Sequence, residues 1–344
     1  MKSLYKDKYF SILGDSISTF EGCSQPKDAA YYDRAKKMET GVLTPADTWW
    51  GIVLEGLGGK LLVNNSWSGS TVCNHPAFEV PSYACSEERT SALSKEGITP
   101  SVIIVYMGTN DWGMGLRVTD DNEASTTVFS GAYREMLCRL KNNYPEAEIW
   151  CITLPISKCL AKEKFTFPYY CSGRHILEYC ETICKVATEE GCRVIDLYSL
   201  GELHDTIDGF HPNKRGMKTL ANAVLDALHN NEKKEKTMKT GNERLDEMYV
   251  EALEYVVGAK KASVSFIQRQ CKVGYHRGSK ILEWMEEQGY VGPYNGETPR
   301  AVFATEKEVE ELKKKLEKGE DIGRQEEEPQ KCAYEIIYGS EELS

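Results

Sequence analysis

Four short segments of this 344-residue sequence carry side chains that together could perform nucleophilic catalysis. Ser16 ends a Gly-Asp-Ser segment, and a serine hydroxyl becomes a strong nucleophile only when a base removes its proton. His211 can be that base, and Asp208, three residues earlier, can orient the imidazole and stabilise its charged form. Gly69 and Asn110 offer N–H groups that can receive the negative charge of a tetrahedral intermediate. These residue types predict acyl transfer through a serine.

Each of these segments also has a purely structural interpretation. Ser16 could cap a helix, Asn110 could cap a turn, and Gly69 could be an ordinary loop glycine. Asp208 and His211 could form a surface pair. The functional interpretation is favoured because all the segments follow apolar runs that are expected to be strands of one sheet. In open α/β folds, ligands bind at the carboxyl edge of such a sheet.

Five short apolar runs predict the sheet that would position these groups. They lie at 9–13, 60–64, 101–106, 148–153 and 193–197 and are typical of strands buried on both faces. Segments with helical periodicity lie at 49–57, 133–141, 176–188 and 214–228. Strands that alternate with helices imply right-handed crossovers, so the sequence predicts an α/β fold with a doubly wound, mainly parallel five-stranded sheet.

Residues 8–230 resemble the SGNH or GDSL hydrolases, an esterase family with a flavodoxin-like three-layer fold. The resemblance is carried by Ser16 in Gly-Asp-Ser, Gly69, Asn110 in Gly-Thr-Asn-Asp and His211 in Asp-x-x-His. It implies that Ser16 is the nucleophile, His211 the general base and then acid, and Asp208 the group that orients the base. It also implies an oxyanion hole formed by the Ser16 and Gly69 backbone N–H groups with the Asn110 side-chain amide.

Two long insertions, 20–46 and 156–175, are expected to wall the substrate pocket. The resembled family includes carbohydrate deacetylases, lysophospholipases and thioesterases. The aromatic residues of the insertions are Tyr31, Tyr32, Phe165, Phe167, Tyr169 and Tyr170. Tyrosines suit the face of a sugar, whereas a lipid site should show a longer aliphatic surface. We therefore expect a small acyl ester, of the acetyl type, on a polar carrier such as a carbohydrate; simple loop packing is the alternative use of these aromatics.

The sequence after residue 230 predicts a second, smaller domain. Residues 231–243 are polar and lysine-rich and are expected to be a linker between a first domain at 1–230 and the second. Three helical patterns follow, and then two short extended runs flank an Asn-Gly turn signal, which together predict a winged helix-turn-helix domain at 244–304. The predicted helices cover 246–257, 263–271 and 275–288, and the extended runs lie within 289–303. Residues 305–344 are expected to form a short helix with a capping box, Thr305 with Glu308, and an acidic tail.

Residues 246–304 resemble the gamma domain of the FtsK DNA translocase, which reads short duplex motifs. The resemblance implies that the helix beginning near Gly274 enters the major groove and that Arg277 can reach a guanine edge. His276 stands where the family usually has asparagine, and Lys280 replaces a usual arginine. The expected DNA-binding residues are Arg269, Lys272, Tyr275, His276, Arg277 and Lys280. A winged helix that binds protein, or that is merely structural, is the alternative.

Composition excludes several other classes of protein. Forty-two Lys and Arg against fifty-three Asp and Glu give a net charge of −11, so a general electrostatic grip on nucleic acid or on an anionic membrane is not expected. Residues 241–304 hold eight basic and nine acidic side chains, so DNA binding would require the basic residues to share one face. There is no run of eighteen apolar residues, and residues 1–9 are too polar for a secretory signal, so a cytoplasmic protein without a membrane partner is expected.

The twelve cysteines are best interpreted as reduced thiols in such a compartment. No CxxC pair or interleaved histidine supplies a zinc spacing, so neither a metal nor another cofactor is expected. The oligomeric state cannot be read from these patterns.

Two functional hypotheses follow. The first is a serine esterase whose winged helix is an accessory module that binds duplex DNA. The alternative is a DNA-binding regulator whose α/β domain senses an acylated metabolite with little or no catalysis. The set of Ser16, Asp208 and His211 favours the first, because a pure sensor has no chemical need for it.

Overall fold

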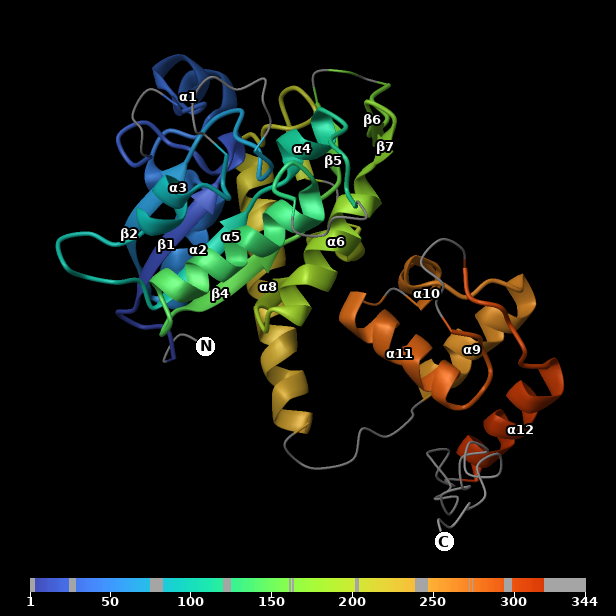
Figure 1. Cartoon of the computed structure of the whole chain (residues 1–344). Helices are drawn as coiled ribbons and strands as arrows, with labels where there is room; N and C mark the ends of the chain where they lie inside the picture. Colours follow the sequence, from blue (N-terminus) through green and yellow to red (C-terminus); the bar gives the residue numbers. More distant parts are fainter. Residues whose placement is uncertain are drawn as a thin grey trace, which may run out of the picture. The chain divides into compact units, whose positions relative to one another are not determined.

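A computed structural model describes most of the chain, in two compact units whose main boundary falls between Gly241 and Asn242 (Figure 1). The described residues are 4–24, 29–74, 83–119, 125–160, 162, 164–201, 204–238, 247–271, 273, 275–293 and 299–318.

The first unit is built on a five-stranded sheet in the order β2-β1-β3-β4-β8, with every neighbouring pair parallel. The strands are β1 (Tyr9–Gly14), β2 (Lys60–Ser66), β3 (Val102–Tyr106), β4 (Glu148–Ile152) and β8 (Arg193–Ile195). All five fall in the predicted apolar runs, which confirms the doubly wound parallel sheet. The chain leaves β1 for β2 on one side and later returns to β3 on the other, so the carboxyl ends of β1 and β3 flank the topological switch point where ligands bind in such folds.

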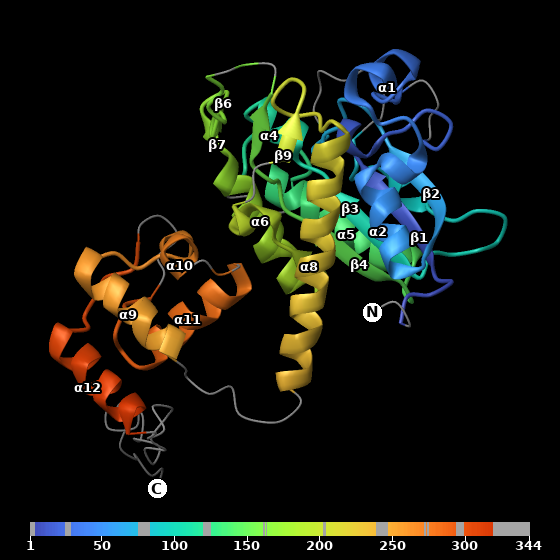
Figure 2. The ribbon, with the colours of Figure 1, turned by 180° about the vertical axis from the view of Figure 1, so that it is seen from behind.

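Helices cover both faces of this sheet and make it the middle of three layers. The helices α2 (Trp49–Leu57) and α8 (Lys214–Met238) pack together on one face, and α5 (Phe129–Asn143) and α6 (Ile176–Glu189) pack together on the other (Figures 1 and 2). The central strands β1, β3 and β4 are therefore buried on both sides, which explains their nearly continuous apolar sequences. Strand residues without exposed surface include Phe10, Ile12, Ile103, Ile104, Val105 and Trp150.

The connections of the first unit contain shorter elements. They are the 3₁₀ turns Ser16–Ser18 and Pro45–Asp47, the helices α1 (Arg34–Thr40), α3 (Glu87–Ser91), α4 (Thr109–Gly113) and α7 (Leu197–Leu200), and the strands β5 (Ser157–Cys159), β6 (Tyr170–Cys171), β7 (Arg174–His175) and β9 (His204–Thr206). β5 pairs in parallel with β9, and β6 pairs with β7 in an antiparallel hairpin. The sequence did not predict these four strands, because runs of two or three residues are too short to show a period.

The first part of the expected linker, residues 231–238, is helical. α8 does not end at Leu228 but continues to Met238. This segment has no glycine or proline before Gly241 and is rich in lysine and glutamate, which are good helix formers. The rest of the expected linker, from residue 239, lies outside the described residues.

The second unit contains three helices at the predicted places, α9 (Glu247–Ala259), α10 (Val264–Cys271) and α11 (Tyr275–Glu287). α10 crosses α11 at Gly278, where an added Cβ would lie 3.4 Å from the side chains of both Val264 and Gln268. The predicted extended runs are represented by an antiparallel bridge between Val291 and Val302, and the Asn-Gly turn signal lies outside the described residues. The winged helix as a whole therefore stays a prediction.

A fourth helix of the second unit, α12 (Glu306–Glu317), begins at the predicted capping box of Thr305 and Glu308. It packs on α9 through Val309 and Leu312, which are buried, and the Lys313 Nζ lies 2.7 Å from a carboxylate oxygen of Glu254. This helix was expected to belong with the tail, but its apolar stripe is covered by α9. The acidic tail beyond it lies outside the described residues.

Candidate active site

The first catalytic candidate, Ser16, lies in a tight turn at the end of β1. Asp15 caps the turn, because its Oδ1 accepts a hydrogen bond of 3.0 Å from the Ile17 N–H. Gly14 is needed for space, since a Cβ there would approach the Ser18 Cβ to 2.7 Å. Ser16 keeps 7% of its surface exposed, and burial raises the pKa of the Asp15 carboxyl to about 6. The turn thus presents the hydroxyl at the carboxyl edge of the sheet on a rigid support.

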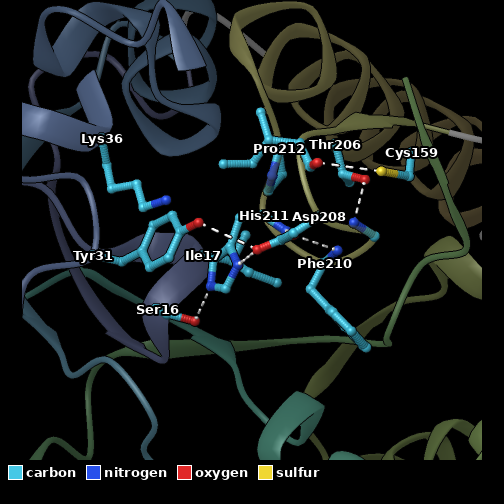
Figure 3. A network of polar contacts seen from close by, with 12 residues as sticks. Ser16, Ile17, Tyr31, Lys36, Cys159, Thr206, Asp208, Phe210, His211 and Pro212 are labelled. Carbon is cyan, nitrogen blue, oxygen red and sulfur yellow. Dashed lines mark hydrogen bonds and ion pairs between the residues drawn. The ribbon is translucent and has the colours of Figure 1, made fainter. Parts of the chain in front are cut away.

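The structure brings Ser16, His211 and Asp208 together in one hydrogen-bonded chain (Figure 3). His211 Nε2 lies 2.8 Å from the Ser16 Oγ, and His211 Nδ1 lies 2.7 Å from the Asp208 Oδ2. With the proton on Nδ1, the Ser16 hydroxyl donates to a free Nε2 lone pair, which is the tautomer that a general base requires. Ser16 and His211 are 195 residues apart in the sequence, so this contact is a product of the fold.

The carboxylate of Asp208 is held by its own loop. Its Oδ1 accepts hydrogen bonds from the Phe210 N–H at 2.9 Å and the His211 N–H at 2.8 Å. Burial by itself would raise the pKa of Asp208, but hydrogen bonds from the side chain and backbone of His211 outweigh it and hold the pKa below its ordinary value. Asp208 is therefore ionised at neutral pH.

Elements that the sequence did not reveal position this loop. Gly209, whose φ of 104° favours glycine, donates its N–H to the Thr206 Oγ1 at 2.9 Å, and its carbonyl accepts from the Ser157 hydroxyl. Thr206 and Ser157 belong to the paired strands β9 and β5. The short β5–β9 ladder thus fixes the turn from which Asp208 and His211 project.

Gly69 lies in the loop after β2, and Asn110 lies in the first turn of α4. Gly69 is exposed and has a φ of 77°, and a Cβ would meet nothing within 4 Å, so glycine is required for its backbone conformation. The Asn110 Nδ2 donates to the carbonyl oxygen of Ser70 at 2.7 Å. This bond uses one hydrogen of the amide and orients the second N–H, which is the group an oxyanion would need.

Two buried ionisable residues, Asp111 and Arg89, hold the loop of Gly69 in place, and neither had a predicted role. Asp111 accepts from the Val72 N–H at 2.8 Å and the Cys73 N–H at 3.0 Å. Arg89, which is 1% exposed, donates to the backbone carbonyls of Gly14 at 2.9 Å and Asn65 at 2.6 Å.

Arg89 also donates to side chains of β2 and of the loop that follows it. Its Nε lies 2.9 Å from the Asn65 Oδ1, and its Nη1 donates to the Ser70 hydroxyl. Burial lowers the pKa of Arg89 to about 9, yet the four acceptors satisfy its guanidinium. Arg89 stands in an ordinary polar helix sequence, so no motif could have indicated this function.

The aromatic residues of the two insertions differ in their contacts and in their exposure to solvent. Phe167 stacks on Trp112 with ring centroids 5.7 Å apart, which is loop packing. Tyr169 and Tyr170 stay exposed, with 39% and 68% of their surface accessible. Tyr31 lies flat on the imidazole of His211 (Figure 3).

The expected DNA-binding residues of the second unit are only partly described. Arg269 is exposed on α10, and Arg277 and Lys280 are half-buried on α11. Lys280 lies 3.6 Å from a carboxylate oxygen of Glu283. Lys272 and the side chains of Tyr275 and His276 lie outside the described residues.

Two general features of the described residues bear on the site. No group of three or more His, Cys, Asp or Glu side chains among them could hold a metal ion. Within the same part of the chain, every helix is too short or too polar to span a membrane.

Each of the two units matches a known protein family. Residues 8–164 match the GDSL-like lipase/acylhydrolase family, and residues 243–305 match the FtsK gamma domain. The first unit therefore carries a GDSL-like hydrolase domain and the second an FtsK gamma domain. The hydrolase match ends before Asp208 and His211, so it is the geometry that joins these two residues to Ser16.

Relatives with curated descriptions match the second unit. The DNA translocase SpoIIIE of Bacillus subtilis (strain 168) is 45% identical over 78 residues, which are 23% of this chain and 10% of the translocase. The DNA translocase FtsK of Borreliella burgdorferi is 54% identical over 56 residues, or 16% of this chain and 7% of that protein. The chain thus spans about a tenth or less of the length of these relatives.

Solved structures match the first unit. A protein described as a GDSL-like lipase from Bacteroides uniformis ATCC 8492 is 28% identical with a TM-score of 0.50, over 67% of this chain and 99% of that one. Another from Bacteroides ovatus ATCC 8483 is 24% identical with a TM-score of 0.51, over 65% and 99% of the two chains, and shows the same fold.

Proposed function

We propose that the first unit is a serine esterase in which Ser16 is the nucleophile, His211 the general base and Asp208 the residue that orients it. The observation that carries the proposal is the pair of contacts at His211, 2.8 Å to the Ser16 Oγ and 2.7 Å to the Asp208 Oδ2. A surface ion pair would need neither the serine hydroxyl nor this alignment. The GDSL-like hydrolase domain at 8–164 supports the same assignment.

The proposed reaction is hydrolysis of an ester in two steps. The Ser16 Oγ attacks the ester carbonyl while His211 Nε2 takes the hydroxyl proton, and the Ser16 and Gly69 backbone N–H groups with the Asn110 amide receive the oxyanion. His211 then returns the proton to the departing alcohol, which leaves an acyl-enzyme. Water, deprotonated by His211, attacks the acyl-enzyme and releases the acid with Ser16 restored.

The substrate that we propose is a small acyl ester, of the acetyl type, on a polar carrier such as a carbohydrate. The exposed Tyr169 and Tyr170 of the second insertion support a polar carrier, because an aromatic ring with a hydroxyl can both stack on a sugar and donate a hydrogen bond. A lipid substrate would instead favour an aliphatic surface.

The test is turnover of a series of p-nitrophenyl esters from acetyl to long acyl chains, followed by acetylated sugars. Ser16→Ala should abolish turnover and leave the fold intact, whereas Ser91→Ala, at an exposed serine of α3, should match the wild type. Substantial turnover by Ser16→Ala would refute the nucleophile. A wild-type chain that hydrolyses no ester but binds DNA would favour the alternative, a regulator that senses an acylated metabolite.

For the second unit, we propose duplex DNA as the partner. Its likeness to the gamma domains of DNA translocases, 45% identity over 78 residues in one case, supports this proposal. The acidic balance of the unit means that affinity must come from a few basic side chains on α10 and α11, so binding should weaken steeply with salt. Selection from random duplexes at low salt tests it, and recovery of neither an enriched motif nor salt-dependent binding would contradict it.

A further inference from the structure

Tyr31, from the first insertion, contacts the candidate base His211 and its partner Asp208. Its ring is stacked on the His211 imidazole, with centroids 3.5 Å apart and planes 8° from parallel. Its hydroxyl donates to the Asp208 Oδ2 at 3.2 Å, the same oxygen that lies 2.7 Å from His211 Nδ1 (Figure 3). One side chain therefore restrains the imidazole plane and the carboxylate together.

The backbone of Tyr31 is tied to the nucleophile turn. Its N–H donates to the Thr19 Oγ1 at 2.8 Å, and the Thr19 hydroxyl donates to the Ser16 carbonyl oxygen at 2.8 Å. The next residue, Tyr32, is fully buried and donates its hydroxyl to the Pro212 carbonyl oxygen at 2.8 Å. The insertion is thus anchored at both ends of the Ser16–His211 contact.

The base needs such a restraint because its loop lies near solvent. The side chain of Asp208 is 42% exposed and that of His211 is 17% exposed, whereas Ser16 is set in a buried turn. The stacked ring limits rotation of the imidazole about its Cβ–Cγ bond. Its π face also favours the imidazolium that forms when Ser16 attacks. Burial and then the Asp208 carboxylate raise the pKa of Tyr31, so its hydroxyl keeps the proton that it donates.

We infer that Tyr31 is a positioning residue for the esterase, which stacks on His211 and hydrogen-bonds Asp208 so that the imidazole stays aligned with the Ser16 hydroxyl. The inference rests on the proposed function, because it gives Tyr31 a part in the same reaction. It goes beyond that proposal by placing a residue of the first insertion, rather than a residue of the hydrolase motifs, in the alignment of the base.

Two substitutions in the full chain separate the contributions of the ring and the hydroxyl. Tyr31→Phe keeps the stacked ring and should lower kcat about two- to tenfold, the worth of one hydrogen bond. Tyr31→Leu keeps an apolar cover but loses the π face, and should lower kcat by about 10- to 100-fold with little change in KM. A plot of kcat/KM against pH should rise on its acid side, which we call the acid limb. The acid limb should lie at lower pH for Tyr31→Leu than for Tyr31→Phe, because the imidazolium loses its contact with the face of the aromatic ring. A merely structural residue would not move this limb.

Tyr32→Phe is the matched control, since it removes a hydroxyl bonded to the same loop but to no side chain of the triad. It should leave the acid limb in place. Wild-type kcat and an unshifted limb in both Tyr31 variants would overturn the inference.

A second measurement does not depend on turnover. The chain has six histidines, so the imidazole C–H resonances of His211 can be assigned by comparison with His211→Gln. The stacked ring should move them upfield by its ring current, and Tyr31→Leu should abolish this displacement while Tyr31→Phe keeps it. Unchanged resonances in Tyr31→Leu would overturn the contact. A displaced resonance in a chain without Ser16-dependent turnover would sustain the contact and refute the proposed function instead.

Discussion

The two units of the chain hold their candidate functional side chains in different ways. In the first unit, Ser16 and Asn110 are fixed by partners from other elements, and buried Arg89 and Asp111 brace the loop between them. In the second unit, Arg269 is exposed on its helix, and Lys280 has an acidic neighbour on its own helix turn. Substituting a buried side chain with several hydrogen-bond partners should cost much stability or activity. Substituting one exposed side chain of a surface site should cost little, because such a site depends on many weak contacts.

The largest expected effect is that of Arg89→Ala, which tests whether the stability of the first unit depends on the buried Arg89 guanidinium and its hydrogen bonds. It leaves four buried neutral acceptors in Gly14, Asn65 and Ser70 without their donor, so it should lower the free energy of unfolding by about 3–5 kcal/mol and lower activity with it. Urea unfolding followed by near-UV circular dichroism measures this, because five of the six tryptophans lie in the first unit.

Arg134→Ala is the matched control for this prediction. Arg134 pairs with Glu189 and Glu190 while its side chain is 34% exposed, so its removal should cost less than about 1 kcal/mol. If Arg89→Ala and Arg134→Ala lost the same free energy of unfolding, the buried hydrogen bonds of Arg89 would not matter more than an exposed ion pair.

The next effect is kinetic. Asn110→Ala removes the proposed oxyanion donor and the bond to the Ser70 carbonyl, and should lower kcat about 10²–10³-fold with a smaller change in KM. Steady-state kinetics on the best ester measures it, with Asn142→Ala, at an exposed position of α5, as the control. A change confined to KM would move Asn110 from the oxyanion hole to substrate binding.

A third effect depends on pH and concerns the buried carboxyl beside Ser16. Burial raises the pKa of Asp15 from its ordinary 3.8 to about 6, so the folded chain holds a proton that the unfolded chain loses between these values. The stabilisation from this proton is complete below the lower value and is lost as pH rises through the upper one. Asp15→Asn cannot titrate, so between pH 4 and pH 7 it should gain on the order of 3 kcal/mol relative to the wild type. Urea unfolding of both proteins measures this. If the free energies of unfolding of the wild type and of Asp15→Asn changed equally with pH, Asp15 would not be buried as a neutral acid.

The smallest effect is expected in the second unit. If Arg277 reads a guanine, Arg277→Ala should lose about 1–3 kcal/mol on the preferred duplex and reduce discrimination between sequences. Arg269→Ala, if it contacts phosphate, should weaken all sequences alike and lower the salt slope by about one. Titrations of both variants on selected and random duplexes measure this. An equal loss of affinity on the two duplexes in Arg277→Ala would contradict base reading by Arg277.

The sequence was sufficient for the parts of the fold that have a periodic signal. The central strands β1, β3 and β4 are nearly continuous apolar runs because helices bury both faces, and α12 starts at a capping box that two residue types specify. The sequence misjudged the end of α8, where a run rich in lysine and glutamate, which are good helix formers, continues the helix to Met238. Strands such as β5 and β9 left no pattern, although they position Asp208 and His211.

The sequence by itself determined the doubly wound sheet and the identity of Ser16, Gly69, Asn110, Asp208 and His211 as candidates, because chemical type and place after a strand can be read along one dimension. Only the tertiary structure decided what holds them in place. The hydroxyl of Tyr31 reaches Asp208 across 177 residues, and Arg89 reaches the Gly14 carbonyl across 75. Contacts of this kind join single residues from separate elements, so they impose no period or motif on the sequence and exist only once the chain has folded.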